Sequence, residues 1–383
     1  MPLLAAILPL LMAAPGSVPD KPVWVGVWEG TVGTYPVRLC MDRWGDDAPG
    51  RGAYYYLSTL EPLSLTEDDS EIAWIEHGAE DPDARWSFTQ QSEERLRGTW
   101  TRGARRLPFD LKPIAWTKGE WDGTCDSAAF MGPRLLPGTI ATEPEDVGGW
   151  RYTRQIYSPP RQFKNEVSAE SFTFTPEQPG DSKILEWLAS RLPRGTMADD
   201  ATECIAGAVA SVGADGYYGE FLYPVEVGPS FLTVYENSDT YCGGAHPNAF
   251  FLYKTFDRQS GQEINLARWL NDAGREHHPA ENEFDSYDTL LPALRKLIVK
   301  HQPQEGFPEA DTDEPGPLDA ECLEVAEEQE FWTFGFRREG MLFVPSVPHV
   351  ATPCMGTYTV PWSELMPYLS AEGRAGVARL NGG

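Results

Sequence analysis

Basic residues are scarce in this chain. Its 383 residues include 31 Lys and Arg against 58 Asp and Glu, which gives a formal net charge of -27. A field of this sign repels nucleic-acid phosphates and anionic membranes, and it attracts cationic proteins, amines and metal ions. The sequence therefore argues against nucleic acid as a partner. Solubility alone is the ordinary explanation of such a charge, so a partner has to be argued from other features.

Long apolar runs are also missing. The run from Leu3 to Ala14 is too short to span a bilayer comfortably, and no later stretch approaches the length of a membrane-spanning helix. Small residues such as Gly16 and Ser17 follow the run, as a signal peptidase requires, although no Lys or Arg precedes it. We predict a signal peptide over residues 1–20 and a mature protein, periplasmic or secreted, with no membrane span.

The six cysteines do not occur as close pairs. A zinc site uses closely spaced ligands, and no C-x-x-C pair is present. In an oxidising compartment, an even number of scattered cysteines indicates disulfides. Connectivity does not follow from sequence, and pairing between nearest neighbours is the interpretation adopted here. It predicts the bonds Cys40–Cys125, Cys204–Cys242 and Cys322–Cys354.

Familiar catalytic motifs are absent from the sequence. There is no G-x-S-x-G elbow, no H-E-x-x-H helix and no phosphate-binding glycine loop. Glu276, His277 and His278 could bind a metal weakly, but a solvated loop is the more ordinary interpretation. A glycosidase needs two facing carboxylates, and the sequence singles out no such pair. We therefore predict no catalytic residue, no metal site and no cofactor.

Glycine and proline are abundant, with 36 and 33 residues, which indicates many turns. Over residues 21–115, short stretches rich in Val, Trp and Tyr alternate with turn residues and show no helical period. This pattern predicts a small antiparallel β-barrel or sandwich. We expect side chains to fill its core, and a cavity for a small apolar ligand is the alternative.

The pattern changes after the first domain. Residues 116–149 lack periodicity and are predicted to form a linker, and residues 150–383 mix helical and strand patterns. We expect an α+β domain with a mainly antiparallel sheet, so the whole chain is predicted to be α+β. The segment Pro303–Glu321 has seven acidic residues and no basic ones, and is predicted to be an exposed loop. Helices are expected over 181–192, 202–212 and 290–298, and strands over 217–227, 231–235, 249–257, 331–336 and 341–344.

Two segments of the second half are distinctive together. The first is Tyr241-Cys242-Gly243-Gly244-Ala245-His246-Pro247-Asn248, which precedes a predicted strand. The second is Pro348-His349-Val350-Ala351-Thr352-Pro353-Cys354-Met355-Gly356. Over residues 150–370 the chain resembles the extracytoplasmic domain of RsiV-type anti-sigma factors, which sense lysozyme; a similar domain accompanies some peptidoglycan deacetylases. His349 and Cys354 depart from the family pattern, which has tyrosines there.

The glycine-rich segment is the best candidate site. Paired glycines let a backbone approach a partner closely, and His246 could titrate, ligate a metal or act as a base. We favour the more ordinary alternative, in which the glycines shape a tight turn and the imidazole bonds to loop carbonyls. The predicted binding residues are Tyr241, Gly243, Gly244, His246, Asn248 and His349.

The resemblance implies a non-catalytic binding protein of the cell envelope. A lysozyme or another basic cell-wall enzyme is the implied partner, and the net charge of -27 would steer such a protein towards it. The segment Pro303–Glu321 and the glycine-rich segment are the expected contacts. The alternative is a peptidoglycan-directed enzyme or a carbohydrate-binding accessory protein with its site at His246.

Overall fold

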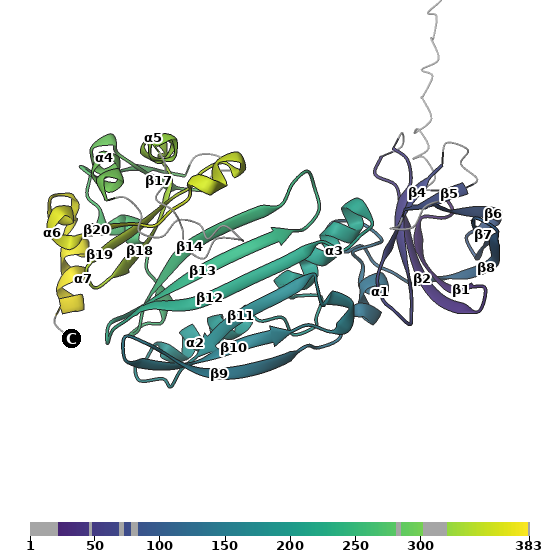
Figure 1. Cartoon of the computed structure of the whole chain (residues 1–383), viewed down its shortest axis with the longest axis horizontal. Coiled ribbons are helices and arrows are strands. Elements are labelled where there is room, and N and C mark those ends of the chain that lie inside the picture. The colour runs from purple at the N-terminus through teal and green to yellow at the C-terminus, as the bar shows by residue number, and fades with distance from the viewer. Residues whose placement is uncertain are drawn as a thin grey trace, which may run out of the picture.

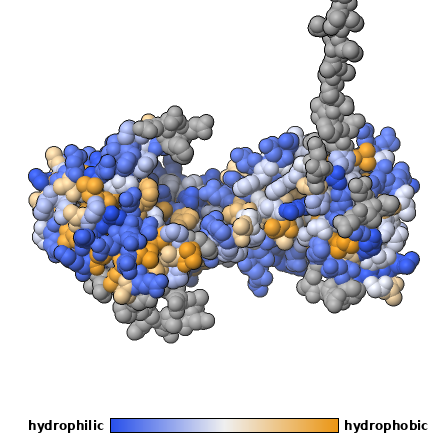
Figure 2. Space-filling view, turned by 90° about the horizontal axis from the view of Figure 1, so that it is seen from above, coloured by the Kyte–Doolittle hydropathy of each residue, from blue (hydrophilic) through white to orange (hydrophobic). Residues whose placement is uncertain are grey.

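The computed structural model describes residues 22–45, 48–68, 73–77, 83–280, 285–301 and 320–381. The predicted signal peptide and most of the acidic segment Pro303–Glu321 lie outside the described residues. A barrel stands at one end, a large twisted sheet in the middle, and a smaller sheet with helices at the other end (Figure 1). Seen from above, both ends are wider than the middle (Figure 2). The chain is therefore α+β, as the sequence predicts.

The amino-terminal domain is a closed barrel rather than a sandwich. Eight strands pair in sequence order, each antiparallel to the next, and the last strand closes on the first. The strands are β1 (Gly26–Val32), β2 (Tyr35–Asp42), β3 (Arg51–Tyr56), β4 (Leu63–Glu67), β5 (Ala73–His77), β6 (Ala84–Ser92), β7 (Arg95–Arg102) and β8 (Arg105–Ile114).

Aromatic side chains fill the barrel, as expected for so small a one. Trp74 and Trp86 are fully buried in it, and the buried carboxylate of Glu76 lies among them. Glu76 Oε2 accepts hydrogen bonds from Tyr54 Oη at 2.7 Å, Trp86 Nε1 at 3.2 Å and Trp100 Nε1 at 2.7 Å. These bonds compensate the cost of burying a charge. The interior is thus occupied by side chains.

The middle of the molecule is a seven-stranded sheet in the order β15-β14-β13-β12-β11-β10-β9. All neighbours are antiparallel except β11 and β12, and this parallel pair needs a crossover. Helices α2 (Asp181–Ser190) and α3 (Asp200–Val212) supply the crossover. The strands are β9 (Thr139–Val147), β10 (Trp150–Ser158), β11 (Val167–Thr173), β12 (Tyr217–Val227), β13 (Phe231–Tyr241), β14 (Asn248–Asp257) and β15 (Gln262–Glu263), and the short helix η2 is Arg161–Phe163.

The carboxyl-terminal lobe packs a three-stranded sheet against β14 and surrounds it with short helices. Its core is apolar and aromatic, with Phe336 and Trp269 stacked at 5.7 Å. Its strands are β16 (Arg275–His278), β17 (Tyr287–Leu290), β18 (Trp332–Arg337), β19 (Gly340–Pro345) and β20 (Tyr358–Pro361). Its helices are η3 (Leu266–Trp269), α4 (Pro292–Lys300), α5 (Ala320–Glu328), η4 (His349–Cys354), α6 (Trp362–Leu365), η5 (Met366–Tyr368) and α7 (Ala371–Asn381).

The predicted linker 116–149 differs from the expectation. It contains α1 (Ala128–Met131), η1 (Gly132–Arg134) and strand β9, which pairs with β10 along its whole length. Strand β9 forms the edge of the sheet, and most of its residues are exposed on both faces. An edge strand of this kind has no alternation of apolar and polar residues, so the sequence pattern does not predict it.

The barrel and the central sheet share one core. Tyr55 of β3, Phe130 of α1 and Ile205 of α3 belong to the same buried cluster. Tyr55 Oη donates to the Phe130 carbonyl at 2.7 Å, and Arg51 Nη1 donates to the Ser211 carbonyl at 2.9 Å. The segment between the domains is therefore packed into the junction instead of spanning it freely.

A buried ion pair lies in this junction. Arg134 has no exposed side-chain surface, and its Nη2 lies 2.7 and 2.6 Å from the two carboxylate oxygens of Asp215. Its Nε donates to the carbonyl of Leu60 at 2.8 Å. Leu60 precedes β4 of the barrel and Asp215 precedes β12 of the sheet. One guanidinium thus joins three separate segments.

Replacing Arg134 by Met should destabilise the fold strongly. Removal of one partner of a buried pair leaves an uncompensated charge, here Asp215, at a cost of about 3–5 kcal/mol. The free energy of unfolding from urea titration, followed by tryptophan fluorescence, measures the change. Lys118→Met is the matched control, because it breaks the exposed pair with Asp122 and should have little effect. Equal urea midpoints for both variants would contradict the assigned role.

Candidate binding surface

The predicted glycine-rich segment forms the turn between β13 and β14, and α3 holds it in place. The disulfide Cys204–Cys242 joins the turn to α3. Gly243 and Gly244 have φ values of +94° and +96°, which favour glycine. A Cβ on Gly243 would lie 1.8 Å from Ser211 Oγ, so the turn packs directly on the helix. All three predicted disulfides, Cys40–Cys125, Cys204–Cys242 and Cys322–Cys354, are formed.

The predicted binding residues around this turn have different environments. Tyr241 Oη donates to the carbonyl of Gly244 at 3.1 Å, and its ring lies 6.3 Å from that of Tyr217. His246 is exposed, and its Nδ1 lies 2.9 Å from the carbonyl oxygen of Pro247. Asn248 is exposed at the start of β14. The turn thus presents an imidazole at its tip and a tyrosine pair at its base.

The sixth predicted binding residue stands on another element. His349 begins η4, which contacts β14 and α5 and is joined to α5 by the disulfide Cys322–Cys354. The orientation of the His349 side chain lies outside what the structure describes. The second segment of the sequence resemblance therefore contacts β14, the strand that follows the first segment.

An exposed tryptophan lies beside the turn. Half of the Trp121 side chain is exposed (50%), and its ring packs over α3, where a Cβ on Gly207 would lie 2.8 Å from it. The same Cβ would lie 2.9 Å from the carbonyl of Cys242 in the turn. Trp121 N donates to Asp126 Oδ2 at 2.6 Å, and burial raises the pKa of the Asp126 carboxyl. A buried side chain thus fixes the loop that presents Trp121.

The barrel contributes a second exposed tryptophan at the junction. Trp44 is 51% exposed and lies 6.0 Å from the guanidinium of Arg51, which bonds to the end of α3. Sequence reasoning missed both tryptophans, since a surface tryptophan carries the same signal as the core tryptophans of the strands. We call the set formed by Trp44, Trp121, Tyr217, Tyr241 and His246 the junction surface.

Two buried carboxylates on neighbouring strands of the central sheet share one arginine partner. Glu220 of β12 and Glu236 of β13 are 1% and 5% exposed, and Arg191 at the end of α2 contacts both. Tyr218 Oη donates to Glu220 at 2.8 Å, and burial raises the pKa of Glu220. The sequence singled out no such pair, because the strand register is what brings the two together. Arg191 forms ion pairs with both, and Lys254 Nζ lies 4.0 Å from Glu236 Oε2, so we assign the two carboxylates to attaching α2 to the sheet.

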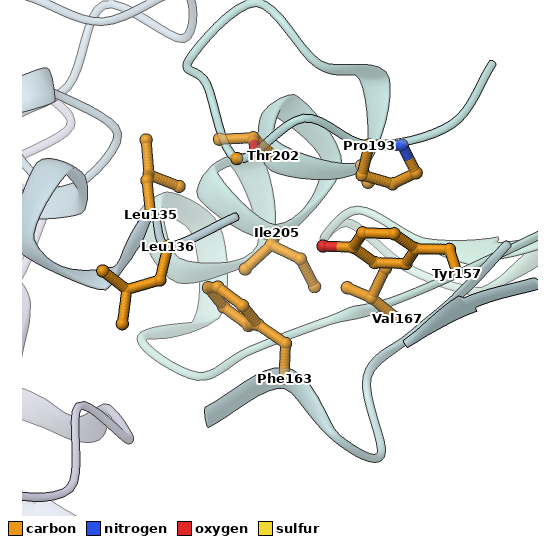
Figure 3. A pocket seen from close by; sticks show the side chains of 10 residues that line it. Leu135, Leu136, Tyr157, Phe163, Val167, Pro193, Thr202 and Ile205 are labelled. Atoms are coloured by element: carbon orange, nitrogen blue, oxygen red, sulfur yellow. The ribbon is translucent and has the colours of Figure 1, made fainter. Parts of the chain in front are cut away.

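A small apolar pocket lies between the segment after α1 and helix α3 (Figure 3). Leu135, Tyr157, Phe163 and Ile205 converge on it. Its free space is about 20 Å³, which holds about one water molecule. Organic ligands need several hundred Å³, so the pocket is a packing defect of the junction core.

The histidine pair lies in a hairpin, so the expected solvated loop is wrong. Strand β16 carries His277 and His278 and pairs with β17. His277 Nδ1 lies 3.0 Å from Asp288 Oδ1, whereas the ring of His278 stacks on Tyr287 at 4.6 Å. Neighbouring residues of a strand point to opposite faces, so the two imidazoles do not converge. Within the described residues, no group of three or more potential ligands is arranged to hold a metal.

Comparison with known proteins gives a distant likeness. No protein-family model and no curated protein matches the chain. A DUF3298 family member from Bacteroides fragilis shares 11% identity, with 62% of this chain and 94% of that chain covered and a TM-score of 0.36. A DUF3298 family protein from Pseudomonas aeruginosa shares 14%, with 62% and 96% covered and a TM-score of 0.31. Scores of this size establish neither a family nor a function.

No helix among the described residues combines the length and the apolar character that a bilayer crossing requires.

The two glycines of the turn allow a matched test of its packing. Gly243→Ala should destabilise the protein by about 3 kcal/mol, because a left-handed alanine is strained and its Cβ overlaps Ser211. Gly244→Ala has the same backbone strain but open space around its Cβ, so about 1 kcal/mol is expected. Thermal unfolding of both variants measures the difference. Equal losses would show that the turn does not pack on α3.

Proposed function

We propose that this chain is an exported, non-catalytic binding protein of the cell envelope whose partner is a cationic protein, such as a lysozyme or another basic cell-wall enzyme. The observation that supports this most is the β13–β14 turn. It is tied to α3 by Cys204–Cys242, presents the exposed His246 and lies beside the half-exposed Trp121. A fixed, exposed aromatic surface of this kind is typical of a protein-binding site.

The disulfides support a site of action outside the cytoplasm. All six cysteines are paired, and no free cysteine remains. Disulfides persist in oxidising compartments and are rare where glutathione keeps thiols reduced. The proposal therefore places the protein in the periplasm or the surrounding medium, in agreement with the predicted signal peptide.

The charge supports a cationic partner. A net charge of -27 on this chain accelerates association with a basic protein and makes the affinity sensitive to salt. Lysozymes are usually strongly basic. The resemblance of residues 150–370 to a lysozyme-sensing domain favours the same partner class.

The buried state of the two sheet carboxylates favours binding over hydrolysis. Glu220 and Glu236 are two carboxylates that share the partner Arg191, and both are almost fully buried. A substrate has to reach the reacting carboxylates through a concave, accessible site. The proposal therefore assigns no catalytic residue.

Carbohydrate binding is the second candidate function. The half-exposed rings of Trp44 and Trp121 favour it, because flat aromatic surfaces can pack against the apolar faces of sugar rings. An accessory protein that binds peptidoglycan would use the same junction surface. Calorimetry with soluble muropeptides separates the two candidates, since only the carbohydrate-binding protein should give heat with them.

Binding of a basic lysozyme tests the proposal directly. Titration calorimetry at about 10 mM salt should give a micromolar or tighter affinity, weakened at least tenfold at about 300 mM because the charges are screened. Trp121→Ala should weaken binding about tenfold, as expected for a central aromatic contact. His77→Ala on the barrel wall is the control and should bind like the wild type. Absence of heat at low salt would overturn the proposal.

A further inference from the structure

An open groove runs between α4 and α5 in the carboxyl-terminal lobe. Its volume is about 920 Å³, which is enough for several side chains. The two helices belong to the carboxyl-terminal lobe, at the end of the central sheet opposite to the barrel (Figure 1). The groove is lined by Pro292, Arg295, Val299, Ala320, Leu323, Glu324, Glu327, Glu328 and Glu330.

The lining of this groove has an excess of negative charge. It contains four carboxylates and one guanidinium, so its formal charge is 1 - 4 = -3. The guanidinium of Arg295 donates from Nη1 to the main-chain carbonyl of Glu328 at 2.7 Å. Among the described residues, no ion pair joins a cation to any of the four glutamates. The described part of the groove therefore carries uncompensated negative charge.

The floor of the groove is apolar. Val299 of α4 and Leu323 of α5 are partly exposed and pack on the core of the lobe. An apolar floor under an acidic rim matches lysine and arginine, whose aliphatic stems cover apolar surface while the charged heads reach the carboxylates. Basic amphipathic helices use grooves of this chemistry.

The groove is also held in shape. Ala326 of α5 is fully buried in the lobe core, and Cys322 of α5 is bonded to Cys354 of η4. A groove that needs little rearrangement loses little free energy when it is filled. Helix α5 is thus a fixed wall rather than a loosely attached element.

We infer that the α4–α5 groove binds a basic, partly apolar polypeptide segment of the partner. The inference rests on the proposed function for the partner class, and on the groove itself for the place and chemistry of contact. The segment 302–319 of this chain has six acidic residues and no basic ones. Its charge has the same sign as the groove, so charge complementarity favours a foreign basic segment as the occupant.

The test uses a fluorescein-labelled amphipathic peptide of Lys and Leu as the probe, and the same peptide with Glu for Lys as its negative counterpart. Fluorescence anisotropy at about 10 mM salt should show binding of the basic probe only. The triple variant Glu324→Gln, Glu327→Gln and Glu328→Gln should weaken it about tenfold, since each exposed pair contributes modestly. A basic lysozyme should compete with the probe for the groove and displace it.

The matched control removes the same charge elsewhere. Glu93→Gln, Glu94→Gln and Glu186→Gln take three exposed carboxylates from the barrel and from α2 and should leave probe binding within about twofold of the wild type. Equal losses in both triple variants, or no binding of the basic probe, would overturn the groove assignment. If lysozyme binds the groove triple variant as tightly as the wild type, the groove assignment is overturned but the proposed function stands. Probe binding in the groove without any lysozyme binding would overturn the proposed function alone.

Discussion

The buried ion pair between Arg134 and Asp215 is the constraint on which the arrangement of the molecule depends. It joins the barrel, the connecting segment and the central sheet at one fully buried point. A charge can be buried there only because partners surround it. Separating the two domains would remove these partners and would therefore cost free energy. The shared core of Tyr55, Phe130 and Ile205 and the Cys40–Cys125 disulfide complete the junction. The barrel therefore acts as a fixed flank of the sheet.

This fixed geometry determines what the surface can do. Trp121 of the connecting segment packs on α3, and Trp44 of the barrel lies over Arg51, which bonds to the end of α3. Helix α3 in turn carries the β13–β14 turn through Cys204–Cys242. The α4–α5 groove adds an acidic contact on the lobe beyond the sheet. A partner that touches both surfaces would find them already in place, so little of its binding energy would be spent on ordering.

Much of the fold could be predicted because local patterns determined it. Short strands separated by turn residues predict the barrel, and helical periods predict α2, α3 and α4. The nearest-neighbour pairing of the cysteines is confirmed, although their spacing alone does not determine it. Strand β9 was missed because an edge strand exposed on both faces has no apolar period. The sequence predicts a loop at the β16–β17 hairpin, because its short strands show no apolar alternation.

The candidate surface was only partly visible in the sequence. The turn at Gly243 and Gly244 could be predicted locally, since two adjacent glycines favour a backbone with positive φ values. Three other features depend on contacts between distant segments. The packing of Trp121 on α3 and the groove between α4 and α5 come from contacts between distant segments. Glu220 and Glu236 come together because both contact Arg191. No local pattern encodes these.

We propose that a cationic protein binds both the β13–β14 turn and the α4–α5 groove, two surfaces that are already formed before it arrives. Hydrogen–deuterium exchange with and without a saturating basic lysozyme at low salt tests it most directly. The account predicts slower amide exchange in the β13–β14 turn and in α5, with the strands of the barrel core unchanged. Protection confined to the barrel, or no protection anywhere, would contradict it.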